Sequence, residues 1–446
     1  MSVPLGAAAA AAAETNVIRE DRTARAPRAP RVARVAGGDL EPPVLRGTAA
    51  DNFAASVRVR FPDFWFDVAG EPYAIESPHL IARETVETIR AAARDAWRIF
   101  AHVLPVVVGL PDDELVAIGV PANAIAACRD VGGPVPTLVG RFDFALTPAG
   151  PKLLEFNADT PFFLWESFEV AGALVEAAGL VDPNAGALET LRAGIARTLC
   201  DLAPTARVAV TAYNTWREDW FTGLFAARVA SLALGRAVDV VPLCDLRVDE
   251  RGAYDADGRR IDALWRFYPL EHLARDRAGD VLLASLRDGH VRTINPPHAL
   301  LAQNKATLAI VWGLRQSAYV DAELRARIES IFLPTFLDLP SGSGRYVRKP
   351  VFGREGRSVT IYDAETIVEG ALEPAYGAQP AIYQQYVELP TVALDGVRAG
   401  SFDRAIHTCF VVDGAACAVG MRVGGRITDV KALMVPLGFE NGAGVF

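Results

Sequence analysis

Polar and apolar residues alternate along residues 140–146 and again along 152–158, which is the pattern of two half-buried β-strands. The segment between them, 147–151, contains two prolines and a glycine, so the chain is expected to reverse direction there. These features together predict a β-hairpin centred on Ala149.

The predicted hairpin places Asp143 opposite Glu155 and Arg141 opposite Asn157. Because side chains two residues apart on a strand share a face, all four belong on one side of the hairpin. Facing carboxylates repel each other unless a cation lies between them, and hard oxygen donors suit Mg²⁺. This face therefore predicts a magnesium site for a nucleotide. The alternative is a solvated polar face on which Arg141 neutralises Asp143.

The rest of the chain alternates helical and strand patterns. Hydrophobic periodicity predicts helices over residues 80–104, 112–127, 163–181, 185–202, 219–235, 304–316 and 321–332. Strands are predicted over 207–213, 238–243, 345–349, 358–362, 381–388, 405–412 and 415–422. The order strand, helix, strand across 207–243 favours an α/β lobe with a partly parallel sheet.

Composition narrows the class of protein. The chain has 446 residues, of which 51% are hydrophobic and 22% charged, as expected for a globular protein of two or three lobes. Its net charge of −9 argues against nucleic acid as the main partner, and no apolar run has the roughly 18–20 residues of a membrane span. Five scattered cysteines without a C-x-x-C pair favour a cytoplasmic location. Residues 1–48, rich in Ala, Pro and Arg, are predicted to be a disordered tail.

Several cationic residues and one glycine loop are candidates for chemistry. Lys305 would lie in the first turn of its helix, where a cation is unfavourable unless an anion is close. Lys349 precedes the loop Gly353–Gly356, whose backbone amides could cradle phosphates. Arg422 and Lys431 could reach a phosphoryl group, since such oxygens match cationic side chains. Taken alone, each of these features could equally be an exposed side chain or an ordinary turn. Together with the oxygen donors they are the components of an ATP-using transferase or ligase.

Six blocks of sequence, in order, resemble the glutathionylspermidine synthase family: RFD…LLEFNADTP…LWE, WRFYPLE, QNKATLAIVWGL, YVRKPVFGREGRSV, IYQQYVELP and MRVGGRITDV. The likeness runs from about residue 53 to the C-terminus. It implies an α/β (α+β) protein with the ATP-grasp fold, in which a pre-ATP-grasp and substrate lobe (49–300) precedes a nucleotide-binding lobe (301–446). It also implies ligation of a small-molecule carboxylate to an amine. No cysteine precedes Cys128, so the amidase activity of bifunctional relatives is not expected.

The resemblance implies a role for each matching residue. The expected magnesium ligands are Asp143, Glu155 and Asn157. The residues expected to hold ATP are Lys305, Lys349, Gly353, Arg354, Glu355, Gly356, Gln384, Gln385, Tyr386, Val387 and Lys431. Arg141 is expected near the reacting carboxylate and Arg422 at the acyl phosphate. The substrate candidates are Glu218, Asp219 and Glu271, the first two for a polyamine.

The implied reaction forms an amide through an acyl phosphate and releases ADP. Phe162 and Phe163 stand where relatives commonly have Thr and Ser, and Trp165 stands where they have Leu. This departure suggests an acid that is smaller or more apolar than glutathione, or a filled pocket. The alternatives are a catalytically silent ATP-grasp scaffold and a phosphotransferase that stops at the acyl phosphate. The complete set of oxygen donors, lysines and Arg422 favours the ligase.

Overall fold

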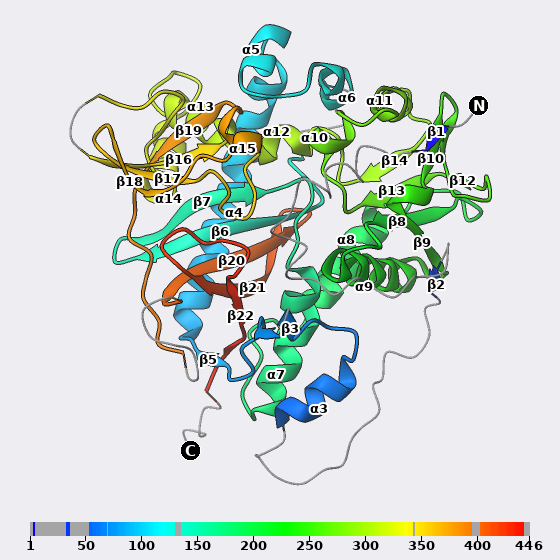
Figure 1. The fold of residues 1–446 in the computed structure, drawn as a ribbon, viewed down its shortest axis with the longest axis horizontal. Coiled ribbons are helices and arrows are strands. Elements are labelled where there is room, and N and C mark those ends of the chain that lie inside the picture. Colours follow the sequence, from blue (N-terminus) through cyan, green and yellow to red (C-terminus); the bar gives the residue numbers. More distant parts are fainter. Residues whose placement is uncertain are drawn as a thin grey trace.

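The computed structural model describes residues 3–4, 33–35, 53–68, 70–129, 135–341, 344–394 and 402–440. Helices and several sheets make up these residues (Figure 1), which confirms the predicted mixed α/β class. Most of the predicted tail, 1–48, lies outside them. Two short strands from it, β1 (Val3–Pro4) and β2 (Ala33–Val35), pair with β10 (Arg247–Asp249) and β9 (Val238–Pro242).

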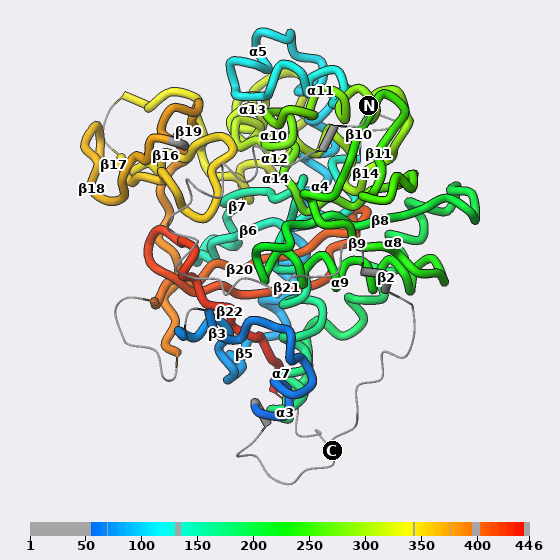
Figure 2. The backbone as a smooth tube through the Cα atoms, turned by 45° about the vertical axis from the view of Figure 1, so that its right-hand side comes forward, coloured from blue at the N-terminus to red at the C-terminus, as the bar shows by residue number. Residues whose placement is uncertain are grey.

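A five-stranded antiparallel sheet carries the predicted hairpin. Its order is β22-β21-β20-β6-β7, formed by Leu433–Val435, Ala415–Gly424, Arg404–Val412, Val139–Thr147 and Gly150–Asn157. Strands far apart in the sequence are therefore neighbours, as the teal β6 and the orange-red β20 show in Figure 2. The sheet combines strands from both predicted lobes, 49–300 and 301–446.

The predicted register of the hairpin is confirmed, with Asp143 opposite Glu155 and Arg141 opposite Asn157. We call these four side chains the polar face of the hairpin. One step beyond Asp143 the register shifts, and Leu154 becomes the extra residue of a β-bulge. A bulged residue has no partner opposite it in the ladder, so its backbone carbonyl is available to a donor from outside the sheet.

The other face of the hairpin packs against helix α4 (Arg83–Val108), which runs behind the sheet in Figure 1. Phe142 and Phe156 stack with their ring centroids 4.0 Å apart, and both rings contact Phe100 of α4. Burial of these rings fixes which face of each strand points inward. The same alternation directs the polar face away from the core.

Two more five-stranded sheets complete the frame. The first, β15-β19-β16-β17-β18, is antiparallel and consists of Thr335–Phe336, Ala381–Gln385, Arg345–Pro350, Thr360–Asp363 and Thr366–Gly370. The second, β14-β13-β8-β9-β2, consists of Arg292–Ile294, Ala263–Arg266, Val208–Ala212, Val238–Pro242 and Ala33–Val35. Its first four strands are parallel, which confirms the predicted partly parallel sheet. The shorter strands are β3 (Asp67–Val68), β4 (Glu71–Pro72), β5 (His79–Leu80), β11 (Gly252–Tyr254), β12 (Arg260–Ile261) and β23 (Leu437–Gly438).

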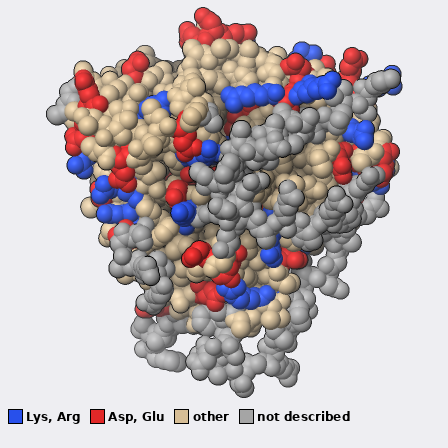
Figure 3. Space-filling model, viewed as in Figure 1, with Lys and Arg blue, Asp and Glu red and all other residues tan. Residues whose placement is uncertain are grey.

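The predicted helices are present, with altered bounds. The helices besides α4 are α3 (Phe53–Arg60), α5 (Asp112–Ala117), α6 (Ile125–Arg129), α7 (Ala171–Ala177), α8 (Ala187–Thr198), α9 (Arg217–Leu234), α10 (Leu270–Leu273), α11 (Gly279–Arg287), α12 (Ala299–Gln303), α13 (Ala306–Leu314), α14 (Ala322–Ile331) and α15 (Pro374–Gly377). Short 3₁₀ turns occupy Ala122–Ala124 and Leu243–Asp245, and a π-helix, Glu166–Val170, precedes α7. Among the described residues, no helix has both the length and the apolar character needed to cross a membrane. On the face in Figure 3, basic and acidic side chains are interspersed over the described part of the surface.

Asn295 joins the hairpin to the parallel sheet. Its fully buried side chain accepts hydrogen bonds from the backbone N–H groups of Leu138 and Val139, at 3.1 and 2.8 Å. It donates to the backbone carbonyls of Val139, Ala158 and Asp159. Because the amide uses both its donors and its acceptor, the start of β6 and the end of β7 are held in one place.

A buried ion pair stabilises the same junction. Arg266, on β13, is 1% exposed and pairs with Asp159 through both terminal nitrogens, with Nη1 at 2.9 Å from Oδ2. Asp159 also accepts from the backbone N–H of Leu270, and Arg266 donates to the carbonyl of Tyr268. The pair therefore connects the residues after β7 to β13 and to the start of α10.

We expect Arg266→Met to lower the free energy of unfolding by about 3–5 kcal/mol, because it leaves Asp159 as a buried charge without its cation. Urea unfolding followed by circular dichroism measures this loss. The matched control is Arg345→Gln, which removes an exposed ion pair with Asp363 and should cost less than about 1 kcal/mol. Equal losses in the two variants would contradict the assignment of Arg266 to the junction.

Candidate active site

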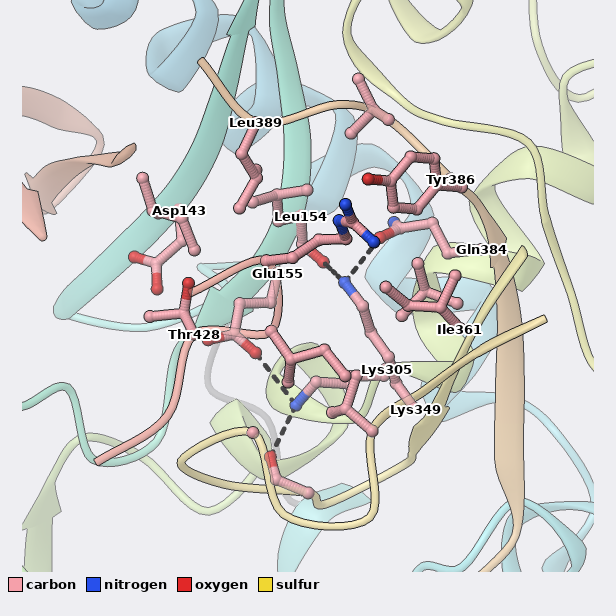
Figure 4. A pocket seen from close by; sticks show the side chains of 18 of the residues that line it. Asp143, Leu154, Glu155, Lys305, Lys349, Ile361, Gln384, Tyr386, Leu389 and Thr428 are labelled. Carbon is pink, nitrogen blue, oxygen red and sulfur yellow. Dashed lines mark hydrogen bonds and ion pairs between the residues drawn. The ribbon is translucent and has the colours of Figure 1, made fainter. Parts of the chain in front are cut away.

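The polar face of the hairpin borders a cavity between two antiparallel sheets. Its lining comes from β6, β7, β20 and β21 on one side and from β16, β17 and β19 on the other (Figure 4). The cavity has an empty volume of about 910 Å³, including space open to solvent.

Lys305 lies at the N-terminus of α13 and points into this cavity. Its Nζ is 3.1 Å from Glu155 Oε2 and donates to the carbonyl of Gly353 at 2.8 Å. A cation at the start of a helix needs an anion nearby, and Glu155 is that anion. Burial acts to raise the pKa of Glu155, but Lys305, Lys349 and Arg141 outweigh it and lower the pKa. Glu155 is therefore ionised at neutral pH.

Lys349 enters the cavity from β16. Its Nζ donates to Gln384 Oε1 at 2.7 Å and to the carbonyl of Leu154, the bulged residue of β7, at 3.1 Å. The pKa of Lys349 is lowered to about 8, mainly by burial and also by the charge of Lys305, while Glu155 opposes the shift. Two lysines thus lie close to one carboxylate. The excess positive charge favours the binding of an additional anion.

Arg141 and Asp143 form a buried bidentate pair on β6. Arg141 Nε and Nη2 lie 2.7 and 2.8 Å from the two carboxylate oxygens, and Nη1 donates to the carbonyl of Phe162. Burial raises the pKa of Asp143, and the charge of Arg141 opposes that rise. The alternative interpretation of the hairpin is a polar face on which Arg141 neutralises Asp143. That ion pair is present in the structure.

The side-chain oxygens of Asp143, Glu155 and Asn157 are suitable ligands for a hard divalent cation. The amide Nδ2 of Asn157 lies 3.4 Å from Asp143 Oδ2 and 3.2 Å from Glu155 Oε1, and the reversed amide would direct its oxygen to the same region. Each carboxylate oxygen retains acceptor capacity beyond its present cation. In the part of the chain that the structure describes, no group of three or more His, Cys, Asp and Glu side chains is placed to hold a metal. The predicted set consists of two carboxylates and an amide, so Mg²⁺ at this site stays a prediction.

A second cavity adjoins the first, with an empty volume of about 1620 Å³ including open space. The two share the lining residues Glu155, Lys305, Gly353, Glu355 and Arg422. The second cavity has groups of both signs in its wall, namely Arg141, Arg354, Arg357, Glu166, Glu218 and Asp219. It also has many aromatic rings, namely those of Trp65, Tyr73, Phe162, Phe163, Tyr213, Phe267, Phe352 and Tyr376. Such a wall can bind an anionic and a cationic group of different molecules side by side.

Glu271 positions one of those cations. It is 1% exposed, and its Oε1 lies 2.5 Å from Arg354 Nη2. Burial acts to raise the pKa of Glu271, but the charge of Arg354 outweighs it and lowers the pKa. This pairing holds the guanidinium of the glycine loop beside the second cavity.

The predicted site residues are divided between the two cavities. The first brings together Asp143, Glu155, Lys305, Lys349, Gly353, Glu355, Gly356, Gln384, Gln385, Tyr386, Val387 and Arg422. The second adds Arg141, Asn157, Glu218, Asp219 and Arg354. Glu271 and the exposed Lys431 are absent from the described lining of both cavities.

Several lining residues were missed from the sequence. Glu166 ends the block LWE, and Arg426 and Thr428 lie within the block MRVGGRITDV, so a signal was present for these three. Tyr73 follows the two-residue strand β4 and belongs to no periodic pattern, so nothing in its neighbourhood marked it. A residue of this kind is found only when the tertiary structure is known.

Phe162 and Phe163 occupy the second cavity with their rings. Phe163 is 5% exposed and has φ +79°, a conformation that is strained for a bulky residue by about 1–3 kcal/mol. A Cβ added to Gly420 would lie 2.7 Å from the Phe163 ring, so glycine at 420 makes room for it. The two rings thus form part of the cavity wall, and the smaller or more apolar acid expected from the sequence stays a prediction.

Comparison with known proteins identifies relatives of the chain. The family described as "Glutathionylspermidine synthase preATP-grasp" matches residues 52–440. A "Putative acid--amine ligase" of Haemophilus influenzae is 29% identical over 300 residues, which are 64% of this chain and 70% of that protein. "Trypanothione synthetase" of Crithidia fasciculata is 26% identical over 275 residues, which are 56% of this chain and 40% of that protein. A glutathione synthetase-like effector from Globodera pallida, a solved structure, is 11% identical with a TM-score of 0.49 and covers 82% of this chain and 90% of its own.

The lowered pKa of Lys349 predicts that nucleotide binding is coupled to protons. At about pH 9, above the value of about 8 for the free protein, Lys349 is mostly neutral, and a bound polyphosphate should raise its pKa and drive proton uptake. Calorimetric titration of ATP in two buffers of different ionisation enthalpy measures that uptake. Uptake should fall at about pH 6, where Lys349 is already charged, and should vanish in Lys349→Met. Undiminished uptake in Lys349→Met would assign the proton to another group.

Proposed function

The chain belongs to the glutathionylspermidine synthase family and is an ATP-dependent acid–amine ligase, and we propose that it forms its amide through an acyl phosphate. One observation carries the proposal: two cavities share a wall of Glu155, Lys305, Gly353, Glu355 and Arg422. A nucleotide in the first cavity would present its terminal phosphate to molecules in the second across that wall.

The first cavity has the two properties that ATP requires. Val347, Ile361 and Leu389 provide apolar surface for the adenine ring, and Lys305 and Lys349 provide charge for the phosphates. The loop Gly353–Gly356 contacts Lys305 through the carbonyl of Gly353. Modelling a Cβ on Gly356 would place it 2.5 Å from the carbonyl of Thr428, so only glycine permits this close approach.

Asp143, Glu155 and Asn157 would hold Mg²⁺, which when bound neutralises charge on the phosphate oxygens. The same side chains are positioned by the chain itself, because Arg141 fixes Asp143 and Lys305 fixes Glu155.

In the first step, an oxygen of the substrate carboxylate attacks the γ-phosphorus, and the bond to the ADP oxygen breaks. Arg141 would orient the carboxylate, and Lys305 and Lys349 would stabilise the charge on the phosphates. Arg422 lines both cavities and makes a long contact, 3.5 Å, with the carbonyl of Asp429, so its guanidinium can turn to a phosphoryl oxygen. Arg422 would stabilise the acyl phosphate.

In the second step, the amine nitrogen attacks the acyl carbon, and phosphate leaves. Glu218 and Asp219 in the second cavity would attract a cationic amine, and the aromatic rings around them add cation–π attraction. This scheme needs no covalent enzyme nucleophile, because the acyl phosphate is the activated species.

Release of ADP from Mg-ATP should require an acid and an amine together. The measurement is a coupled ADP assay in which peptide acids, including glutathione and smaller apolar acids, are crossed with polyamines and monoamines. Release with one acid–amine pair identifies the substrates. ADP release that needs only the acid and does not increase with any amine would contradict the ligase mechanism and favour a phosphotransferase.

Glu155→Gln should reduce turnover by at least about 100-fold, because it removes a carboxylate from the metal site and the partner of Lys305. The exposed Glu365, in the turn between β17 and β18, provides the matched control as Glu365→Gln, which should retain turnover. Thermal melting checks that both variants fold. Wild-type turnover in a folded Glu155→Gln protein would refute the role of Glu155.

A further inference from the structure

Glu166 is a buried carboxylate in the second cavity that the scheme above does not use. It is 3% exposed, begins the π-helix Glu166–Val170 and lines the cavity. A π-turn widens a helix by one residue per turn and often occurs at functional sites. Here it directs a charged side chain into a cavity whose wall also includes Arg141 and Arg422.

One oxygen of Glu166 is satisfied, and the other is not. Oε1 accepts a hydrogen bond from the hydroxyl of Tyr73 at 2.8 Å. Oε2 is buried and has no hydrogen-bond partner among the described residues. A buried carboxylate oxygen without a donor is costly in a protein at rest, and a donor from a bound molecule removes that cost.

Charged groups of several elements line the second cavity together with Glu166. Arg141 of β6 and Arg422 of β21 act on it electrostatically. Tyr73, which follows β4, also interacts electrostatically with Glu218 of α9. Glu166 thus shares the wall of the second cavity with the arginines assigned to the reacting carboxylate and the acyl phosphate, and with Glu218, which is assigned to the amine.

We propose that Oε2 of Glu166 accepts the proton of the substrate ammonium group, so that the amine attacks as a neutral nucleophile; this rests on the proposed ligase mechanism. The ammonium loses one proton to Glu166, and its freed electron pair forms the C–N bond while the C–O bond to phosphate breaks. The second proton of the nitrogen leaves with the phosphate, and Glu166 later returns its own to solvent. Burial raises the pKa of Glu166, against the hydrogen bond from Tyr73 and the charges of Arg141 and Arg422, which makes it a better base.

Hydroxylamine separates this role from the rest of the reaction, because it is neutral near pH 7 and attacks acyl phosphates without a base. The test compares wild type and Glu166→Gln, with Mg-ATP and the acid identified by the ADP panel, beginning with glutathione. Spermidine and hydroxylamine are the two nucleophiles. Glu166→Gln should lower amide formation with spermidine by at least about 100-fold. Hydroxamate formation should stay within about twofold of wild type.

The matched control is Glu169→Gln. Glu169 lies on the same π-helix but pairs with Arg228 and with Trp165 Nε1, and it is outside the described lining of the cavity. This variant should retain both activities. The rate of Glu166→Gln with spermidine should also rise with pH as free amine accumulates, a signature that a purely structural role would not produce.

The outcomes are distinguishable. Equal loss of amide and hydroxamate in a folded Glu166→Gln protein would overturn the proposal and place Glu166 in the first step or in the fold. Unchanged amide formation would overturn it as well. If Glu166→Gln does not fold, Glu166→Asp, which keeps the carboxylate, serves instead and should slow only the spermidine reaction. Absence of hydroxamate from the wild-type protein would refute the acyl phosphate, and with it this proposal, whatever the variants do.

Discussion

The site depends on one constraint, the placement of Asp143 opposite Glu155 across an antiparallel ladder. Two carboxylates that face each other across a ladder repel, so this arrangement is unfavourable unless cations lie close to them. They come from three separate elements: Arg141 from the same strand, Lys305 from the start of α13 and Lys349 from a strand of another sheet. The carboxylate pair therefore organises the cationic site around it.

The β-bulge at Leu154 links the two antiparallel sheets. Leu154 is the extra residue of the bulge on the edge strand β7, and its carbonyl accepts a hydrogen bond from Lys349 of the other sheet. Lys349 also bonds Gln384 on its own sheet, so one side chain bridges the sheets at the back of the cavity. Both of these partners are uncharged. They compensate the buried charge of Lys349 only in part, which agrees with the lowered pKa of this lysine. An anionic ligand would supply the charge that the carbonyl and the amide lack.

The parts of the fold governed by local periodicity could be predicted from the sequence. The register of the hairpin followed from its length and its turn residues, and Gly235, with φ +64°, caps α9 at the last residue of the helix predicted over 219–235. The polar face could also be predicted, because strand alternation is a local rule. The contacts of Lys305 and Lys349 with Gly353 and Leu154 could not, since they depend on how separate elements pack.

The second cavity was the least predictable part, because its wall comes from segments that have no periodic relation to one another. The family resemblance supplied Glu218 and Asp219, and the structure adds Tyr73 and Glu166. Phe163 departs from the family pattern expected from the sequence at this wall. Its positive φ is a strained conformation for phenylalanine. A strained, buried ring persists only where the surrounding packing determines it, and here Gly420 leaves room for the ring. The packing of the fold therefore sets the position of the Phe163 ring in the cavity wall, and this ring is part of the surface that a bound acid would meet.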